Sequence, residues 1–126
     1  MGVDQTAGRL SLRVDFLGGT PERRLGPGKI ALLEAIARTG SISAAGRSLG
    51  MSYKRAWDLT DAMNRLFKAP VVETRSGGRD HGGAVLTTTG QCVLETYRAL
   101  EVRAMSAADT HLAALAELLA TPSADG

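Results

Sequence analysis

The chain of 126 residues has one cysteine, two histidines and no long run of apolar residues. Because Cys92 is the only cysteine, no disulfide can form within the chain. A membrane-spanning helix needs roughly 18 predominantly apolar residues in succession, and no segment of this sequence offers them. The N-terminus also lacks the pattern of a signal peptide. We therefore expect a cytoplasmic protein that has no membrane partner.

Residues suited to catalysis or metal binding are also scarce. His81 lies in a glycine-rich segment and His111 in a long helical pattern, and neither has a cysteine or acid at metal-ligand spacing. The glycine-rich segment precedes a strand pattern, whereas a phosphate-binding loop precedes a helix. We therefore expect no metal site, no cofactor and no enzymatic activity. An enzyme that uses this segment on a phosphorylated ligand stays as an alternative.

The length suits one compact domain with a real core, and 44% hydrophobic and 22% charged residues are ordinary values for a globular protein. The net charge is only +2, but the charges are unevenly distributed. Between Lys29 and Arg79 nine basic residues face four acids, whereas from Asp80 onward two basic residues face six acids. A basic middle and an acidic tail are typical of a module that binds a polyanion. Ordinary solvated surface charge is the alternative.

Periodic patterns predict the first elements. Polar and apolar residues alternate strictly over residues 9–16, which predicts a half-buried strand. Residues 18–28 hold four glycines and two prolines and predict a loop. Apolar residues recur at helical spacing over residues 29–38, and Gly40 is placed to end that helix.

The stretch SISAAGRSLGMSYKRAW, which starts at Ser41, predicts a helix-turn-helix. Ser41 and Ser43 are both candidate N-caps of a short helix. Gly50 permits the positive φ that a sharp turn demands. Ser52 then caps a third helix over residues 53–67, whose exposed first turn would enter the DNA major groove.

Two short strand patterns, residues 71–74 and 84–87, enclose the segment RSGGRDHGG. This arrangement predicts a β-hairpin with a long tip. As a wing, its cationic side chains would lie along DNA phosphates or enter the minor groove. A plain flexible loop and a nucleotide-binding loop are the alternatives.

The final helix is expected to begin with Thr88 or Thr89 as its cap and to be interrupted near Gly90. Its apolar stripe repeats at alternating spacings of four and three, which suits a partner helix and predicts a homodimer. We predict that the dimer seam contains Val93, Tyr97, Leu100, Ala104, Ala107, His111, Ala114 and Leu118.

Direct readout would come from cations in the first turn of the third helix, because Lys and Arg donate to the major-groove edge of guanine. The serines carry donors suited to phosphate oxygens. Trp57 borders the core line of the helix, so packing is its first interpretation and contact with the DNA backbone its second. The predicted DNA-contacting residues are Ser41, Ser43, Arg47, Ser52, Tyr53, Lys54, Arg55, Trp57, Asp58, Arg75, Gly77, Gly78, Arg79 and His81.

These elements predict an α+β, mostly helical fold: a winged helix-turn-helix with a long C-terminal dimerisation helix. The expected divisions are a flexible N-terminus (1–8), the DNA-binding domain (9–87), the dimerisation helix (88–120) and a flexible tail (121–126).

Residues 40–66, GSISAAGRSLGMSYKRAWDLTDAMNRL, and residues 82–91, GGAVLTTTGQ, resemble the DNA-binding domain of ModE-type molybdenum-responsive regulators. The Ser52-Tyr53-Lys54 and Ala56-Trp57-Asp58 pattern is specific to that group. The G-S-I-S-A-A run is shared with the related LysR-type regulators.

The resemblance implies a homodimer that binds a near-palindromic site on double-stranded DNA. It carries DNA contact over to Ser52, Tyr53, Lys54 and Arg55 and to residues 75–83. It further implies control of genes for molybdate transport or molybdoenzymes, often as a repressor. Full-length relatives continue into molybdate-binding domains for which this sequence has no room, so a separate effector-sensing protein is a further expected partner. The alternative is a winged-helix interaction module that does not read DNA by itself.

Overall fold

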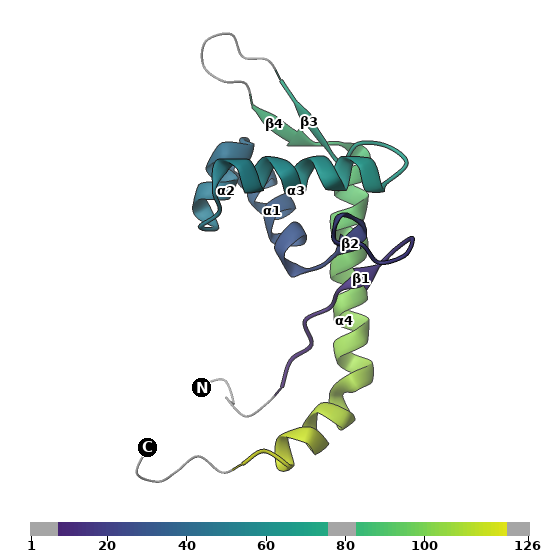
Figure 1. Ribbon diagram of the computed structural model, residues 1–126. Coiled ribbons are helices and arrows are strands. Elements are labelled where there is room, and N and C mark those ends of the chain that lie inside the picture. The colour runs from purple at the N-terminus through teal and green to yellow at the C-terminus, as the bar shows by residue number, and fades with distance from the viewer. Residues whose placement is uncertain (1–7, 76–82, 121–126) are drawn as a thin grey trace, which may run out of the picture.

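The computed structural model describes residues 8–75 and 83–120. The expected flexible ends and most of the tip of the wing, residues 1–7, 76–82 and 121–126, lie outside the described part of the chain. Figure 1 shows a helical head of α1, α2 and α3, a hairpin that projects beyond α3, and the long helix α4, which runs out of the head.

Helix α1 (Pro27–Thr39) forms the centre of the core. Ile30, Leu32, Leu33 and Ile36 are all almost completely buried. The helix starts two residues before the predicted Lys29, because a proline is readily accepted in the first turn of a helix. Its predicted end is confirmed: Gly40 has φ 76°, and its N–H donates to the Ile36 carbonyl at 2.8 Å.

Helices α2 (Ile42–Ser48) and α3 (Tyr53–Leu66) form the predicted helix-turn-helix. The Ser41 hydroxyl accepts from the Ala44 N–H at 3.0 Å, so Ser41 and not Ser43 caps α2. The Ser52 hydroxyl accepts from the Arg55 N–H at 3.1 Å and caps α3, as predicted. Gly50 has the expected positive φ, 72°.

A glycine allows α2 and α3 to cross closely. A β-carbon on Gly46 would come within 2.9 Å of the β-carbon of Ala56. The Gly46 carbonyl also accepts from the Met51 N–H at 2.9 Å, which closes the turn between the helices. The angle at which α3 leaves the head therefore depends on this contact.

The wing consists of β3 (Val72–Thr74) and β4 (Ala84–Leu86), which pair antiparallel with Thr74 opposite Ala84. It is fixed to the head at two points. The Asn64 side-chain oxygen on α3 accepts from the Val71 and Val72 N–H groups at 2.8 and 3.0 Å. The Ala84 N–H donates to the Gly40 carbonyl at 2.8 Å, where α1 gives way to α2.

Helix α4 (Thr88–Glu117) begins where the dimerisation helix was predicted to begin, but its cap is Thr87 and not Thr88 or Thr89. The Thr87 hydroxyl accepts from the Gly90 N–H at 3.0 Å. The expected interruption near Gly90 is wrong, since the helix runs through it without a break. Gly90 is needed for another reason: a β-carbon there would overlap the Val71 carbonyl oxygen.

The predicted strand over residues 9–16 is too long. Only β1 (Val14–Asp15) forms a ladder, with β2 (Arg24–Leu25), which follows the short 3₁₀ turn η1 (Pro21–Arg23). The alternation itself is confirmed, because burial alternates with exposure from Leu10 to Phe16. The residues before β1 have no strand to pair with and lie beside α4 (Figure 1).

Two long-range hydrogen bonds join this N-terminal segment to α4. The Tyr97 hydroxyl donates to the Leu12 carbonyl at 2.6 Å, and the Leu10 N–H donates to the Met105 sulfur at 3.1 Å. Further along α4, the Leu112 side chain lies 3.4 Å from the position that a β-carbon on Gly8 would occupy. We call these contacts, from Gly8 to Leu12, the N-terminal clasp.

A buried lysine holds η1 and β2 against α1. The Lys29 ammonium donates to the carbonyls of Pro21, Glu22 and Arg24, at 3.1, 3.4 and 2.7 Å. Burial lowers the pKa of Lys29, and the nearby Glu22 carboxylate opposes that shift. Among residues 8–75 and 83–120, no helix is long and apolar enough to cross a membrane.

Candidate nucleic-acid interface

Helix α3 has one buried side and one exposed side. Ala56, Thr60, Ala62 and Met63 are buried against the head. The exposed side carries a set of polar, charged and aromatic residues: Tyr53, Lys54, Arg55, Trp57, Asp58, Asp61 and Arg65. The prediction that the polar side of this helix points out of the subunit is therefore confirmed. A helix in this position can offer its side chains to a groove.

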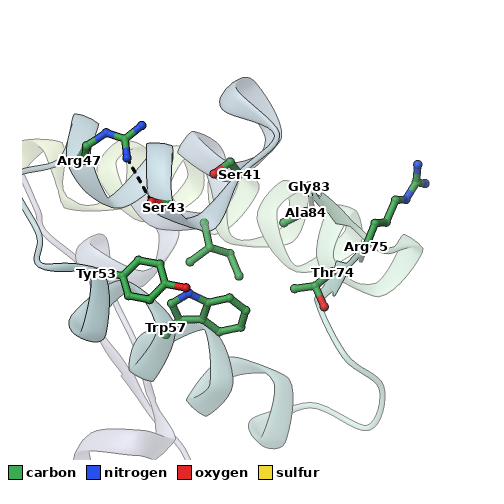
Figure 2. Close-up of a pocket in the computed structure, with 10 residues that line it drawn as sticks. Ser41, Ser43, Arg47, Tyr53, Trp57, Thr74, Arg75, Gly83 and Ala84 are labelled. Carbon is green, nitrogen blue, oxygen red and sulfur yellow. Dashed lines mark hydrogen bonds between the residues drawn. The ribbon is translucent and has the colours of Figure 1, made fainter. Parts of the chain in front are cut away.

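A hollow of about 760 Å³ lies beside the exposed side of α3 (Figure 2). The start of α2, the first two turns of α3 and the base of the wing form its walls. Its lining residues are Ser41, Ile42, Ser43, Arg47, Tyr53, Trp57, Thr74, Arg75, Gly83 and Ala84. Residues separated by up to 43 positions in the sequence, Ser41 and Ala84, thus face the same space.

The rim of the hollow is cationic. Arg47 on α2 and Arg75 after β3 are exposed, and Figure 2 shows their guanidinium groups on opposite sides of it. The Arg47 guanidinium donates to the Ser43 hydroxyl at 3.1 Å, which holds the arginine over the start of α2. Guanidinium and hydroxyl donors are suited to phosphate oxygens.

Exposed ion pairs cross the outer surface of α3. The Lys54 Nζ lies 2.7 Å from the Asp58 Oδ2, one helical turn further on. The Arg65 Nη2 lies 3.1 Å from the Asp61 Oδ2. The Lys54 and Asp58 side chains are 84% and 63% exposed. Because exposed pairs contribute only about 0–1 kcal/mol, these side chains can change partners at little cost.

Tyr53 and Trp57 form an aromatic pair on the wall of the hollow. Their ring centroids are 6.1 Å apart with planes at 62°, an edge-to-face arrangement. Tyr53 is 63% exposed and Trp57 is 38% exposed. Trp57 thus packs on Tyr53 at the surface and not among the core residues, and its ring lines the hollow.

The structure brings together six of the predicted DNA-contacting residues: Ser41, Ser43, Arg47, Tyr53, Trp57 and Arg75. Ser52, which caps α3, and Lys54, Arg55 and Asp58 within α3 are exposed but do not line the hollow. Gly83, which the resemblance had included, lines the hollow, whereas Gly77, Gly78, Arg79 and His81 lie outside the described residues. Thr74 and Ala84 at the wing base, and the positioning residue Asn64, were missed. Their roles depend on the strand register and on long-range contacts.

The predicted dimer seam needs one correction. Tyr97 is only 3% exposed and binds the Leu12 carbonyl of its own chain, so its side chain cannot face a partner helix. Val93 is half-buried against the core. Further along α4, Ala104 is half-buried. The exposed members of the predicted seam are Leu100, Ala107, His111, Ala114 and Leu118.

In the described part of the chain, no group of three His, Cys, Asp or Glu residues is placed to hold a metal ion.

The architecture defines the class of the protein. It has two helices joined by a tight glycine turn, a hairpin fixed to the second of them, and a long following helix. These are the features of the winged helix-turn-helix proteins.

Comparison with known proteins gives the family. Residues 28–91 match the model of the bacterial regulatory helix-turn-helix protein, lysR family, so the chain belongs to that family. The family consists of regulatory proteins and not of enzymes.

Two curated relatives are similar over most of the chain. The chain is 55% identical over 78 residues to the molybdenum-pterin-binding protein MopB of Rhodobacter capsulatus, covering 62% of the chain and 29% of MopB. It is 46% identical over 101 residues to the molybdenum transport protein ModE of Azotobacter vinelandii, covering 80% of the chain and 36% of that protein. The chain thus spans about a third of these relatives and is homologous to their N-terminal region, which confirms the predicted resemblance.

One solved structure has the same architecture. The crystal structure of the CbnR_DBD–DNA complex aligns with a TM-score of 0.53 and 26% sequence identity. The alignment covers 69% of this chain and 95% of that chain. The winged helix-turn-helix with a long C-terminal helix is therefore confirmed as the fold.

Proposed function

We propose that this chain is a homodimeric transcription regulator that inserts α3 into the major groove of double-stranded DNA. The observation that supports this proposal most directly is the exposed side of α3, which lies next to a hollow with arginines on its rim. The CbnR domain that aligns with this chain was solved in complex with DNA. Two-fold symmetry would require a near-palindromic operator whose half-sites are separated by whole helical turns.

In the complex with DNA, some side chains would contact bases and others would contact phosphates. Lys54 and Arg55 project from the first turn of α3, where they would reach base edges. Ser41, Ser43, Arg47 and Arg75 would hold phosphates of the flanking backbone. Lys54 would leave Asp58 to do so, and the weakness of that exposed pair makes the exchange inexpensive.

The names of the relatives suggest the regulated genes. A molybdenum transport protein and a molybdenum-pterin-binding protein are similar to this chain. We infer that the operator controls molybdate transport or molybdoenzyme genes and that binding represses them by covering a promoter. Genomic fragments selected on the protein should therefore lie upstream of such genes, and enrichment of unrelated promoters would contradict this assignment.

DNA binding is tested by combining Lys54→Ala with Arg55→Ala. Loss of two cationic base contacts, at about 1–3 kcal/mol each, should weaken specific binding about 30-fold or more. Fluorescence anisotropy with the selected duplex at several salt concentrations measures this loss. The fold should survive, because both side chains are exposed.

The matched control is Arg103→Ala, which removes an exposed cation from α4 and should leave affinity within a factor of two. In the wild type, the logarithm of the binding constant should fall linearly with the logarithm of salt concentration. An unchanged affinity in the double variant would show that α3 is not the recognition helix.

A further inference from the structure

The aromatic pair, Tyr53 and Trp57, is not explained by the fold. Neither ring belongs to the buried core, and both are among the exposed large hydrophobic residues. The cations on α3 and on the rim suffice to attract phosphate, which an aromatic ring face does not do. An exposed apolar surface beside charged groups needs an apolar partner in the complex.

We propose that the aromatic pair reads the C5-methyl group of thymine in the operator. This proposal rests on the proposed function, because it assigns a specificity role to two residues of the same interface. In the major groove, the methyl group is the only apolar feature by which a base pair is recognised, and apolar side chains contact it. The pair would therefore distinguish thymine from cytosine without a hydrogen bond.

The position of the pair supports this assignment. Tyr53 is the first residue of α3 and Trp57 lies one turn further on, so both rings are at the end of the helix that enters a groove first. Figure 2 shows them side by side, with Ser43 and Arg47 on one side and Thr74 and Arg75 on another. A DNA strand held at its phosphates by this rim would bring its base edges toward the rings.

The rings are also held in place. The edge-to-face contact, with centroids 6.1 Å apart, restricts both side chains before DNA arrives. Trp57 as a whole is 38% exposed, so most of its surface is covered by the protein. A rigid apolar surface loses little conformational entropy on binding, which favours discrimination of a single methyl group.

The test replaces single thymines by deoxyuridine in the duplex that the wild-type protein selects from a random pool. Deoxyuridine lacks only the methyl group and keeps all hydrogen-bonding edges. Burial of one methyl group is worth about 0.8 kcal/mol, or about fourfold in affinity. At least one thymine in each half-site should therefore show a loss of about fourfold, and substitution in both half-sites about sixteenfold.

Variants connect this loss to the pair. Trp57→Ala and Tyr53→Ala should each bind the thymine and deoxyuridine duplexes with more nearly equal affinity than the wild type does. Each variant and the thymine substitution together form a double-mutant cycle, which measures the coupling between the ring and the methyl group. Tyr53→Phe keeps the ring and should keep the fourfold preference. Trp57 is the only tryptophan, so its emission should also change when the wild type binds the duplex.

The outcomes separate this inference from the proposed function. If no duplex is selected, the proposed function fails and the inference falls with it. If a duplex is bound but no thymine depends on its methyl group, the inference alone is wrong. It is also wrong if both alanine variants keep the full preference for thymine over deoxyuridine. In that case any loss of affinity would be equal for the two duplexes, as expected for rings that contact only the sugar–phosphate backbone.

Discussion

Single side chains fix how distant parts of this protein meet. The Tyr97 hydroxyl reaches a carbonyl 85 residues away in the sequence and holds the N-terminal segment on α4. Asn64 satisfies two backbone N–H groups where β3 begins and so sets the angle of the wing. Asn64 thereby positions one wall of the hollow without lining it, whereas neither Tyr97 nor the segment that it holds takes part in the hollow.

The ionisation of Tyr97 gives the first prediction. Burial raises the pKa of its phenol above the ordinary value of 10.0, and the Glu101 carboxylate adds to this shift. Because the folded state keeps the proton longer than the unfolded chain, the stabilisation is complete below pH 10 and is lost as pH rises through the raised pKa. A Tyr53→Phe variant leaves Tyr97 as the only tyrosine, and absorbance at 295 nm should titrate with a midpoint above 10.0.

The control for this titration is Tyr97→Phe, which removes the hydrogen bond and should cost about 1 kcal/mol of unfolding free energy at neutral pH. Its stability should fall less steeply between pH 10 and 11 than that of the wild type. A titration midpoint of 10.0 or below would contradict the burial of this group.

The sequence misassigned one aromatic residue of α4. Helical spacing placed Tyr97 on a seam for a partner helix. In the structure Tyr97 is buried within the subunit. Periodicity shows which residues share a face of a helix, but it does not show what covers that face. Tyr97 lies against the segment that contains Leu12, and no local sequence pattern predicts a contact between residues so far apart.

Among the elements, those with strong local signals were predicted well. Ser41, Gly40, Gly50 and Ser52 mark the ends of helices through their own hydrogen bonds or φ values, and each acts as expected. The strand at β1 was overestimated, because the length of a ladder depends on its partner, and β2 offers only two residues. Sequence reasoning thus recovered the helix-turn-helix, its exposed side and most of the residues around the hollow, but not Thr74 and Ala84, whose places depend on the strand register.

The second prediction concerns the contact between α4 and β3. In Gly90→Ala the new methyl group would overlap the Val71 carbonyl and lie 3.2 Å from the Val71 Cα, so α4 must shift. We expect a loss of about 3 kcal/mol of unfolding free energy, as for an overpacked core. Urea unfolding followed by circular dichroism measures it.

Gly28→Ala is the matched control, because Gly28 also lies in a helix but has no atom within 4 Å of a new β-carbon. Its stability should stay level or rise by up to about 1 kcal/mol, the difference in helix propensity. Equal effects of the two substitutions would show that α4 does not begin against Val71.

At the scale of the whole molecule, α4 is a long arm on a small head (Figure 1). The N-terminal clasp covers part of the arm, whereas Leu100, His111 and Leu118 remain exposed on another part. We infer that a second copy covers this stripe, and that the seam begins at Leu100 because Tyr97 is occupied within its own subunit. A dimer built in this way would set the distance between the two copies of α3.

The third prediction tests that seam. Leu100→Glu should weaken dimerisation at least about 100-fold, since a symmetric interface would have to bury two unpaired carboxylates. Light scattering on a sizing column should then show a mass near 13.2 kDa in place of twice that value. Val102→Glu, at an exposed position on another side of α4, is the control and should leave the dimer intact. If Val102→Glu dissociated the dimer and Leu100→Glu did not, the seam would lie on a different face of α4 from the one inferred.

The N-terminal clasp has a consequence for biosynthesis. A ribosome makes Leu10 and Leu12 early, but their hydrogen-bond partners on α4 follow 95 and 85 residues later. The helix-turn-helix, whose contacts are short in sequence, can form on the nascent chain while the first residues still wait for α4. We therefore expect the N-terminal segment to dock on α4 last, after the helix-turn-helix has formed.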